Sequence, residues 1–300
     1  MKNIINQKII DTHHHLWDPR SNKYDWLISP GHEIFNNVYL IKDYLNDIGS
    51  LNIYKSVHVQ AEINETETLY ETEWIQSVSE SGIGKNKLPN AIIGFVNFLD
   101  EGVEKTLERH TLFSNFRGIR QILNYDINDS SSSHAKIDYL KENIWLKNFS
   151  LLKKYNLSFD LSILQNQTDD AAKLINKEEN ILFIINHTLS PLNITNKISQ
   201  DWIANIKLLS SFDNVAIKLS GFGEFNSNWT EDSIRPLILN SIDNFGINRC
   251  MFGSNFPVDK YLCNASYFDY WNAYYNVVSD FTDNEKDNLF FKNAETFYKI

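Results

Sequence analysis

Residues 8–19 read KIIDTHHHLWDP, a short apolar run that leads into three consecutive histidines and is closed by a proline. The apolar start and the proline are typical of a strand followed by a loop, and they distinguish these histidines from a polar terminal tag. Side chains alternate along a strand, so His13 and His15 share one face while His14 points to the other. The segment therefore predicts a strand that carries two histidines toward one side of a sheet.

The same kind of short apolar or β-branched run recurs along the chain and alternates with longer segments of helical spacing. In residues 198–212, for example, Trp202, Ile206 and Leu209 fall on one helical face. Eight such units in 300 residues predict a (β/α)8 TIM barrel that occupies residues 1–300 as a single domain, with a doubly wound open sheet as the alternative. The eight runs read QKIIDTH, YKSVHVQAE, AIIGFVNF, FRGIRQIL, LSFDLSIL, ILFIINHT, NVAIKLSG and RCMFGSN.

Composition excludes several classes of partner. The formal net charge of -10 opposes binding to nucleic acid, because affinity for phosphate backbones comes from clustered Lys and Arg. Two cysteines, Cys250 and Cys263, are too few for a disulfide framework. The sequence contains no apolar run of about 20 residues that would span a bilayer, and its first residues lack the apolar stretch of a signal peptide. We therefore expect a cytoplasmic protein without nucleic-acid or membrane partners.

Hydrogen-bonding or ionisable side chains stand at the carboxyl end of nearly every predicted strand. In a closed barrel these ends converge on one mouth, which is the face where barrel enzymes place their chemistry. The sequence therefore predicts one cavity lined by residues that are far apart in the chain. These residues are His13, His15, His58, Gln60, Glu62, Asn97, Arg120, Gln121, Asp160, Ser162, Asn186, His187, Lys218, Ser220, Ser254 and Asn255.

The histidines at these strand ends suggest a metal site. Two imidazoles at positions i and i+2 can bind one borderline-soft ion such as Zn²⁺, and His187 at the end of the sixth strand would complete a set of three nitrogens. A chance His-x-His pattern is the alternative. His14, on the opposite face, is expected to pack against the rest of the protein.

The segments DTHHHLWD, YDWL, HVQAE, RGIRQIL, LSFDL, INHT, IKLSG and MFGSNFPVD occur in this order between Asp11 and Asp259. Because it carries these segments in this order, the chain resembles the amidohydrolase superfamily. The resemblance is specifically to its amidohydrolase-related branch of fuconolactonase-like, metal-dependent TIM-barrel hydrolases. That branch also includes a pyrone-dicarboxylate lactonase. The resemblance implies that His13, His15 and His187 line the catalytic centre. It also implies the absence of a bridging carbamylated lysine, and LSFDL offers no lysine.

One residue departs from the pattern of this family. The eighth strand of the superfamily normally ends in an aspartate that binds metal and takes a proton from the attacking water, whereas this chain has Asn255. An amide is not a general base, although its carbonyl oxygen can orient water or act as a ligand. Asp259, four residues later, is the first candidate to replace the missing base, followed by Glu62 and Asp160. A loop cap or surface carboxylate is the alternative interpretation of Asp259.

Several polar and aromatic residues are candidates for substrate binding. Arg120 would hold a substrate carboxylate or an oxyanion through its planar guanidinium. Gln121 and His58 are further polar candidates at neighbouring strand ends. Trp17, in the loop after the first strand, offers an aromatic face that suits a sugar ring, and anchoring of that loop is the alternative role.

These features predict a hydrolase that opens a cyclic ester, most plausibly a sugar-acid lactone. Its partner would be a small molecule, either a lactone or an organic acid, and self-association into a homo-oligomer is left open. A single zinc ion is the candidate cofactor, with metal-independent chemistry as the alternative, because the same branch contains lactonases of both kinds. Two other functions remain open: decarboxylation of an aromatic or muconic-type acid, and a catalytically silent barrel that binds sugar acids.

Overall fold

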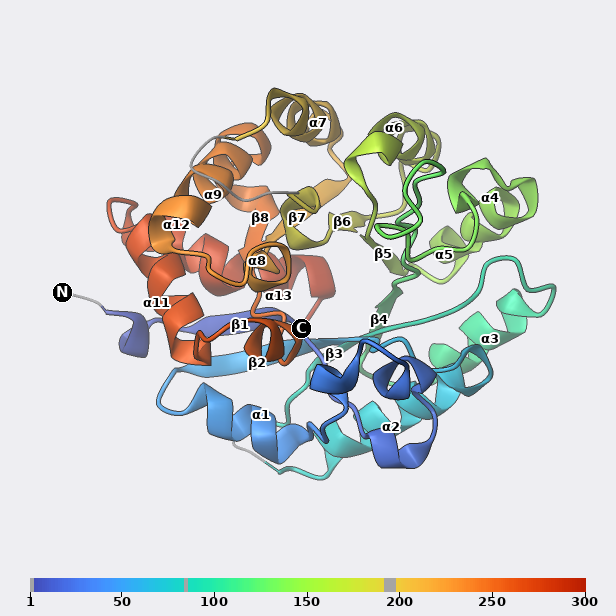
Figure 1. Cartoon of the computed structure of the whole chain (residues 1–300), viewed down its shortest axis with the longest axis horizontal. Helices are drawn as coiled ribbons and strands as arrows, with labels where there is room; N and C mark the ends of the chain where they lie inside the picture. The colour runs from blue at the N-terminus through green and yellow to red at the C-terminus, as the bar shows by residue number, and fades with distance from the viewer. Residues whose placement is uncertain (1–2, 84–85, 192–197) are drawn as a thin grey trace.

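The computed structural model describes residues 3–83, 86–191 and 198–300. Its eight parallel strands follow one another in the order β1 to β8 and form a nearly closed barrel with helices between them, as Figure 1 shows. This confirms the predicted (β/α)8 architecture and a single domain, and every predicted run overlaps one strand. The strands are β1 (Ile9–His14), β2 (Ile53–Val59), β3 (Ala91–Gly94), β4 (Phe116–Ile119), β5 (Ser158–Leu161), β6 (Phe183–Ile185), β7 (Val215–Leu219) and β8 (Cys250–Phe252).

Amphipathic helices surround the strands and bury their apolar faces against the barrel. In α7 the buried residues are Trp202, Ile206 and Leu209, the three that helical spacing predicts. The helices are α1 (Ile41–Ile48), α2 (Thr68–Glu80), α3 (Val103–His110), α4 (Asn143–Phe149), α5 (Leu151–Lys154), α6 (Thr168–Lys177), α7 (Gln200–Ser210), α8 (Phe222–Phe225), α9 (Glu231–Phe245), α10 (Val258–Leu262), α11 (Tyr267–Val277), α12 (Asp283–Asp287) and α13 (Asn293–Tyr298).

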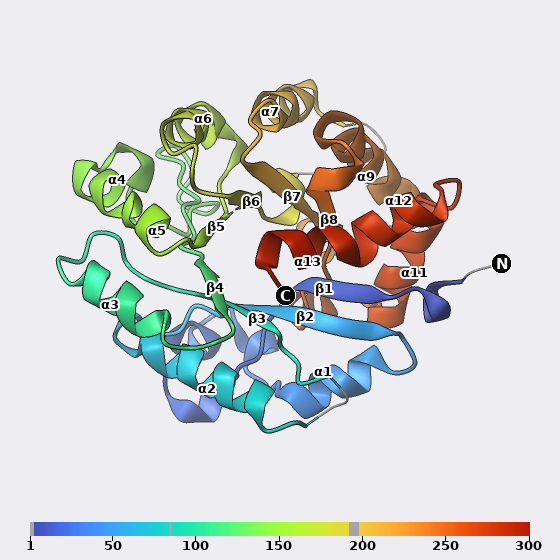
Figure 2. The ribbon, with the colours of Figure 1, turned by 180° about the vertical axis from the view of Figure 1, so that it is seen from behind.

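The two ends of the barrel differ in how they are covered. At the amino end of the strands, α13 lies across the barrel, as Figure 2 shows, and packs Ala294 and Tyr298 against the lowest layer of aliphatic side chains. At the carboxyl end, three short 3₁₀ helices between β1 and α1 lie beside the mouth (Figure 1). They are η2 (Pro19–Ser21), η3 (Asp25–Ile28) and η4 (Glu33–Phe35). The mouth is therefore left as the open end of the barrel.

The seam between β1 and β8 is closed mainly by the segment that follows β8. The backbone N–H of Asn255 donates to the carbonyl of His13 at 2.8 Å, and that of His15 donates to the carbonyl of Phe256 at 2.7 Å. Asp11, fully buried in β1, accepts from the backbone N–H of Ser254 at 2.9 Å and from its hydroxyl at 2.6 Å. These bonds fix the loop after β8 against the histidine-bearing strand.

Within the described ranges, no helix is both long enough and apolar enough to cross a lipid bilayer.

Replacing Asp11 by Ala should lower the free energy of unfolding by at least about 3 kcal/mol, because several buried donors would lose their only strong acceptor. These donors include the hydroxyls of Tyr44 and Tyr267, at 2.8 and 3.0 Å. Urea denaturation followed by tryptophan fluorescence measures the change. Asp269→Ala, which removes an exposed capping contact to Ser266, serves as the control and should cost about 1 kcal/mol. Equal losses in the two variants would contradict a special role for Asp11.

Candidate active site

His13, His15 and His187 lie together at the mouth of the barrel. The ring centroids of His13 and His15 are 5.0 Å apart, and those of His13 and His187 are 4.4 Å apart. All three side chains are buried, and burial is the main reason that the pKa of each imidazole lies well below its ordinary value. The rings are therefore neutral at physiological pH.

His14 points away from this group, as strand alternation predicts. Its ring stacks on Tyr44 of α1 with centroids 4.1 Å apart, and Nε2 lies 3.0 Å from the hydroxyl of Ser56. The side chain is fully buried between the barrel and the helix layer. His14 thus has the packing role expected for it.

His187 is held in place by an unusual backbone. His187, Thr188, Leu189 and Ser190 all have positive φ angles between 45° and 59°, a region that residues other than glycine seldom occupy. Gly221, at φ +72°, passes against the imidazole so closely that a Cβ there would lie 2.5 Å from Nδ1 of His187. Such local strain is typical of functional sites whose surroundings fix the conformation. The ring also lies 3.1 Å, through Nδ1, from the hydroxyl of Ser220.

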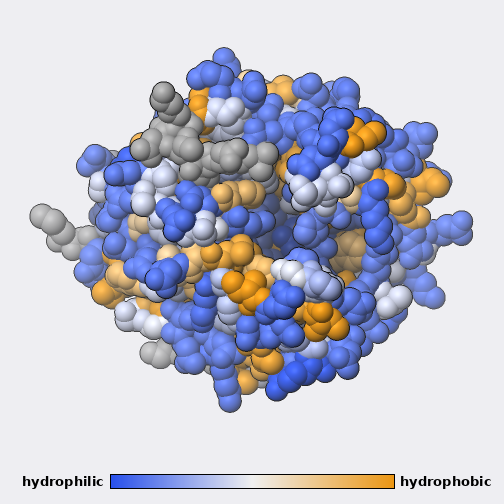
Figure 3. Space-filling model, viewed as in Figure 1, coloured by the Kyte–Doolittle hydropathy of each residue, from blue (hydrophilic) through white to orange (hydrophobic). Residues whose placement is uncertain are grey.

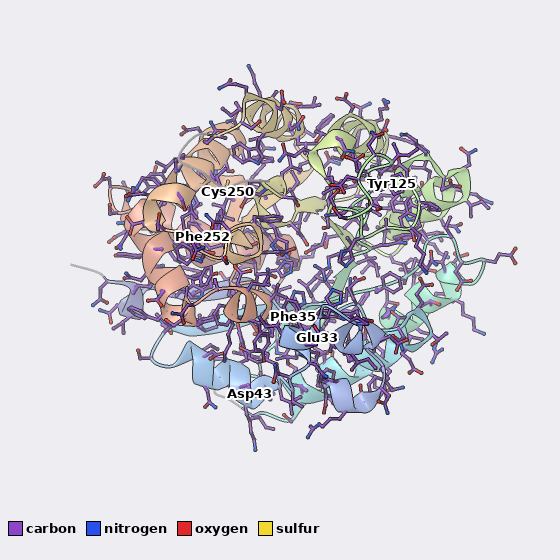
Figure 4. The ribbon with its side chains drawn as sticks, viewed as in Figure 1. Glu33, Phe35, Asp43, Tyr125, Cys250 and Phe252 are labelled. Carbon is purple, nitrogen blue, oxygen red and sulfur yellow. The ribbon has the colours of Figure 1, made fainter. Side chains whose placement is uncertain are left out.

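A cavity of about 340 Å³ opens above these histidines. The space-filling view shows the molecule hollowed near its centre, with hydrophobic side chains on part of the rim (Figure 3). Figure 4 labels Phe35 near the centre of the mouth view, and this residue belongs to the aromatic wall of the cavity. The lining residues are His15, Trp17, Trp26, His32, Phe35, Ala61, Glu62, Arg120, Ile122, Asn124, His134, Ser162, His187, Glu224, Asn255, Val258 and Leu262.

Arg120 supplies a buried positive charge to the cavity. One guanidinium nitrogen, Nη2, donates to the carbonyl of Gln60 at 2.6 Å, whereas Nε has no hydrogen-bond partner among the described residues. A buried donor without a partner is costly, and an acceptor atom beside Nε would relieve that cost. The role of Arg120 in substrate binding stays a prediction.

Asn255 lies between two carboxylates. Its amide nitrogen donates to Asp259 Oδ1 at 2.7 Å and to Glu224 Oε2 at 3.2 Å, which uses both of its hydrogens. The residue has φ +57°, a conformation that asparagine adopts more readily than most residues. Both hydrogens of this amide are therefore engaged by carboxylates.

Asp259 does not reach the cavity. Its carboxylate is fully buried and also accepts from the backbone N–H of Gly223 at 2.9 Å. Burial, and next the charge of Glu224, raise its pKa to about 7. The expectation that Asp259 contacts the attacking water therefore needs correction. Asp259 lies in the first turn of α10, and from there its carboxylate points behind Asn255 and not into the cavity. Its observed contacts hold Asn255 and the start of α8.

Glu224, in α8, is a carboxylate of the cavity that strand-end reasoning missed. Its Oε2 lies 4.0 Å from Nε2 of His187, and 41% of the side chain is exposed to the open cavity. The surrounding protein still shields the carboxylate from bulk water, which raises its pKa, while Arg120 opposes that shift. The residue lies four positions beyond the polar end of β7, so a search of strand ends alone passes over it.

The remaining predicted residues divide between cavity and core. Glu62 lines the cavity and accepts from the side chain of Gln60, and Trp17 lines it while donating to the Asn37 carbonyl at 2.8 Å. Gln121 and His58 do not line this cavity. Gln121 accepts from Trp145 at 2.8 Å, and His58 is fully buried 3.9 Å from the carboxylate of Glu71 in the helix layer. Their expected contacts with substrate are not supported by these positions.

An ion pair lies inside the barrel beneath the histidines. Lys218 Nζ of β7 is 2.5 Å from Asp160 Oδ2 of β5, and both side chains are fully buried. The same ammonium lies 3.4 Å from Nδ1 of His13. Asp160 is therefore engaged by a lysine and is not free to act as a base in the cavity.

The three imidazoles do not by themselves form a zinc site. Across residues 3–83, 86–191 and 198–300, no group of three or more His, Cys, Asp or Glu side chains is arranged to hold a metal ion. Two buried cations lie near the imidazoles: the guanidinium of Arg120 adds to burial in lowering the pKa of His15 and His187, and the ammonium of Lys218 lies 3.4 Å from Nδ1 of His13. The residue expected to supply an anionic ligand after β8 is the neutral Asn255. This arrangement does not support the predicted zinc ion.

Comparison with known proteins fits this geometry. Residues 10–300 match the amidohydrolase family. The chain belongs to this family. It is 35% identical to the uncharacterized protein y4mH of Sinorhizobium fredii, with 97% of this chain and 98% of that protein covered. It is 22% identical to an L-fucono-1,5-lactonase of Burkholderia ambifaria, with 97% and 95% covered.

Solved structures of other proteins share the fold. An amidohydrolase from Burkholderia multivorans with bound zinc superposes with a TM-score of 0.80 at 20% identity and covers 97% of this chain and 99% of its own. A 5-carboxyvanillate decarboxylase from Sphingomonas paucimobilis gives a TM-score of 0.63 at 10% identity, with 98% and 99% covered. The barrel is thus common to hydrolases and decarboxylases, and the fold by itself does not separate these reactions.

The raised pKa of Asp259 predicts a specific effect of pH on stability. An acid whose pKa is 3.8 when unfolded and about 7 when folded binds more protons in the native state, so the native protein loses stability as pH rises through this interval. The side chain of Asp259→Asn stays neutral at every pH. As pH rises between these values, the free energy of unfolding of this variant should therefore increase relative to that of wild type by up to about 4 kcal/mol. Urea denaturation of both proteins across this range measures the difference. Parallel curves for the two proteins would contradict the shift.

Proposed function

We propose that this amidohydrolase opens a cyclic ester, with a sugar-acid lactone as substrate, by attack of water at the mouth of the barrel. The observation that carries the proposal is that one cavity is lined by both Glu224 and Arg120, whose guanidinium Nε has no hydrogen-bond partner in the described part of the chain. Ester hydrolysis needs both a group that takes a proton from water and a donor that stabilises the oxyanion. The 22% identical fuconolactonase is consistent with this class of substrate.

The cavity also suits the size and shape of such a substrate. Its volume of about 340 Å³ is at the small end of ligand sites, which fits a single ring. Trp17, Trp26 and Phe35 form an aromatic side that would pack against the face of a sugar ring. The lining also includes Arg120 and Glu62, whose polar groups would hydrogen-bond ring substituents.

In the proposed reaction, Glu224 removes a proton from a water molecule held beside His187. The hydroxide attacks the carbonyl carbon of the lactone, and Arg120 donates a hydrogen bond to the resulting oxyanion. Collapse of this intermediate breaks the ring C–O bond, and the leaving alkoxide takes the proton back from Glu224. One water and one lactone thus yield one open hydroxy acid. Asn255 and Asp259 position the carboxylate of Glu224 through the amide hydrogen bonds.

A lactone assay, combined with measurements of CO₂ release and of sugar-acid binding, separates the proposed reaction from its two alternatives. A panel of 1,4- and 1,5-lactones of sugar acids, followed by proton release, should reveal turnover of at least one member. Release of CO₂ from aromatic acids without lactone hydrolysis would favour the decarboxylase alternative. Binding of sugar acids without turnover of any panel member would favour a silent barrel.

Glu224→Gln should lower kcat/KM for the lactone about 100-fold or more, because a general base contributes on this scale. Glu62→Gln is the matched control, since it removes a carboxylate of the same cavity that is already hydrogen-bonded to Gln60. We expect less than about tenfold loss for the control. Losses of similar size in both variants would reject Glu224 as the sole base.

His15→Ala should abolish turnover while His14→Ala should retain it, because only His15 faces the cavity. His14→Ala should instead lower the free energy of unfolding, since its ring packs against Tyr44 and bonds to Ser56. Steady-state kinetics and thermal unfolding of each variant separate the two effects. Equal loss of turnover at matched stability would contradict the assignment of faces.

A further inference from the structure

We propose that a pocket at the amino end of the barrel is a second binding site, whose ligand is a small organic acid with one carboxylate on an apolar ring. The pocket lies at the end of the barrel opposite the mouth, so it is separate from the cavity proposed to hold the lactone. The inference therefore does not depend on the proposed function.

The pocket is as large as a ligand site. Its volume is about 440 Å³, compared with about 340 Å³ for the mouth cavity. It lies where α13 meets the amino ends of β4, β5 and β6, on the face of the barrel seen in Figure 2. Ligand sites in proteins commonly have volumes of about 300–1,000 Å³. The pocket thus has room for a small organic molecule.

The charge of the pocket is opposite to that of the whole protein. Arg117 of β4 and Lys299, directly after α13, both line it. Among the described residues of the lining none is Asp or Glu, although the chain has 38 acidic and 28 basic residues. Within the described part of the chain, neither cation forms an ion pair with a carboxylate. A bound anion would therefore meet positive charge without a competing acid.

Arg117 is held in one orientation by three backbone carbonyls. Its Nε donates to Tyr298 at 2.9 Å, and Nη1 donates to Ser114 at 2.7 Å and to Phe116 at 2.8 Å. Nη2 donates to no described residue, so its two hydrogens are available to a ligand oxygen. Burial lowers the pKa of Arg117, and no carboxylate opposes that shift. A guanidinium that is already fixed loses little side-chain entropy when it binds an anion.

Lys299 supplies the second cation. The chain turns at this residue, which has φ +53°, and its ammonium donates to Asn156 Oδ1 at 3.0 Å. Asn156 lines the pocket from the loop before β5. Tyr298, whose carbonyl accepts from Arg117, directly precedes Lys299 in the chain, so the two basic residues meet at the same part of the wall. A carboxylate has two oxygens and would accept from both cations.

Apolar side chains form another part of the wall. Phe113, Leu182 and Phe297 line the pocket and are partly exposed. The ring of Tyr155 also lines it, while its hydroxyl donates to Glu108, outside the lining, at 3.1 Å. Such surfaces pack against the ring of a ligand, and an inorganic anion would leave them exposed to water. The ligand class is therefore an acid with an apolar ring.

A ligand in this pocket would join α13 to the strands that it covers. α13 closes the amino end of the barrel by packing Ala294 and Tyr298 against aliphatic side chains. Arg117 belongs to β4 and Lys299 follows α13, so a carboxylate bound to both would strengthen this contact. Since the ligand would bind the native chain and not the unfolded one, it should raise the temperature of unfolding.

Benzoate is the probe, tested on the full-length protein. It should raise the temperature of unfolding as its concentration increases, and it should slow amide hydrogen exchange in residues 293–300. Benzamide keeps the ring but lacks the charge, and inorganic phosphate keeps a charge but lacks the ring. Both should bind at least about fivefold more weakly than benzoate in calorimetric titrations.

Two substitutions in the lining test the position of the ligand. Lys299→Gln removes one cation and should weaken benzoate binding at least about fivefold. Thr296→Glu, at an exposed position of α13 in the lining, adds a negative charge and should weaken it at least about tenfold. Lys292→Gln is the matched control, because this lysine directly before α13 lies outside the lining and donates to Asn284 at 2.8 Å. It should leave the affinity unchanged.

Arg120→Gln distinguishes the pocket from the mouth, because it removes the cation of the mouth cavity. Protection of residues 293–300 by benzoate should persist in this variant, and its loss in the folded variant would overturn the proposal. Unchanged affinity in both Lys299→Gln and Thr296→Glu, or a native protein that does not bind benzoate, would also overturn it. Equal binding of benzamide would reject recognition of the carboxylate, and equal binding of phosphate would reject the apolar ring.

Discussion

Asp11 accepts hydrogen bonds from Ser254 across the barrel seam and from Tyr44 and Tyr267 in the helix layer. Through these bonds one buried carboxylate joins the first strand, the loop after the last strand and two surrounding helices. The loop carries Asn255, and the strand carries His13, so their relative position depends on this junction. A barrel that opened at this seam would separate the groups that form the cavity.

Above this junction, the barrel interior changes from apolar to polar along its axis. Aliphatic side chains, with Tyr298 of α13, fill the amino end, and the ion pair of Lys218 and Asp160 lies above them. The histidines and Arg120 follow at the carboxyl end. Because the ion pair is shielded from water, its field on His13 is stronger than that of a surface pair at the same distance. The electrostatic environment of His13 is therefore set partly by residues that do not line the cavity.

The replacement of the usual aspartate by Asn255 is matched by its neighbours. Glu224 and Asp259 both accept from the amide of Asn255, so a third carboxylate at this position would face two others at hydrogen-bonding distance. The amide instead joins the two acids and leaves Glu224 facing the cavity. A negative charge beside the end of the eighth strand is thus supplied by Glu224 of α8.

Sequence periodicity by itself determined the barrel and the faces of its first strand, because strand alternation and helical spacing are local properties that leave a direct pattern in the chain. Hence the grouping of His13, His15 and His187 at one end of the barrel was predicted, and so was the packing of His14 on the opposite face. The pattern did not reveal that Glu224 faces the cavity, that Asp259 lies behind Asn255, or that His58 and Gln121 point elsewhere. Loop and helix-start residues have no fixed alternation, so their directions come from tertiary packing. The partner of Lys218 was likewise decided only by the tertiary structure, since an inward lysine on β7 meets Asp160 of β5 only when the barrel closes.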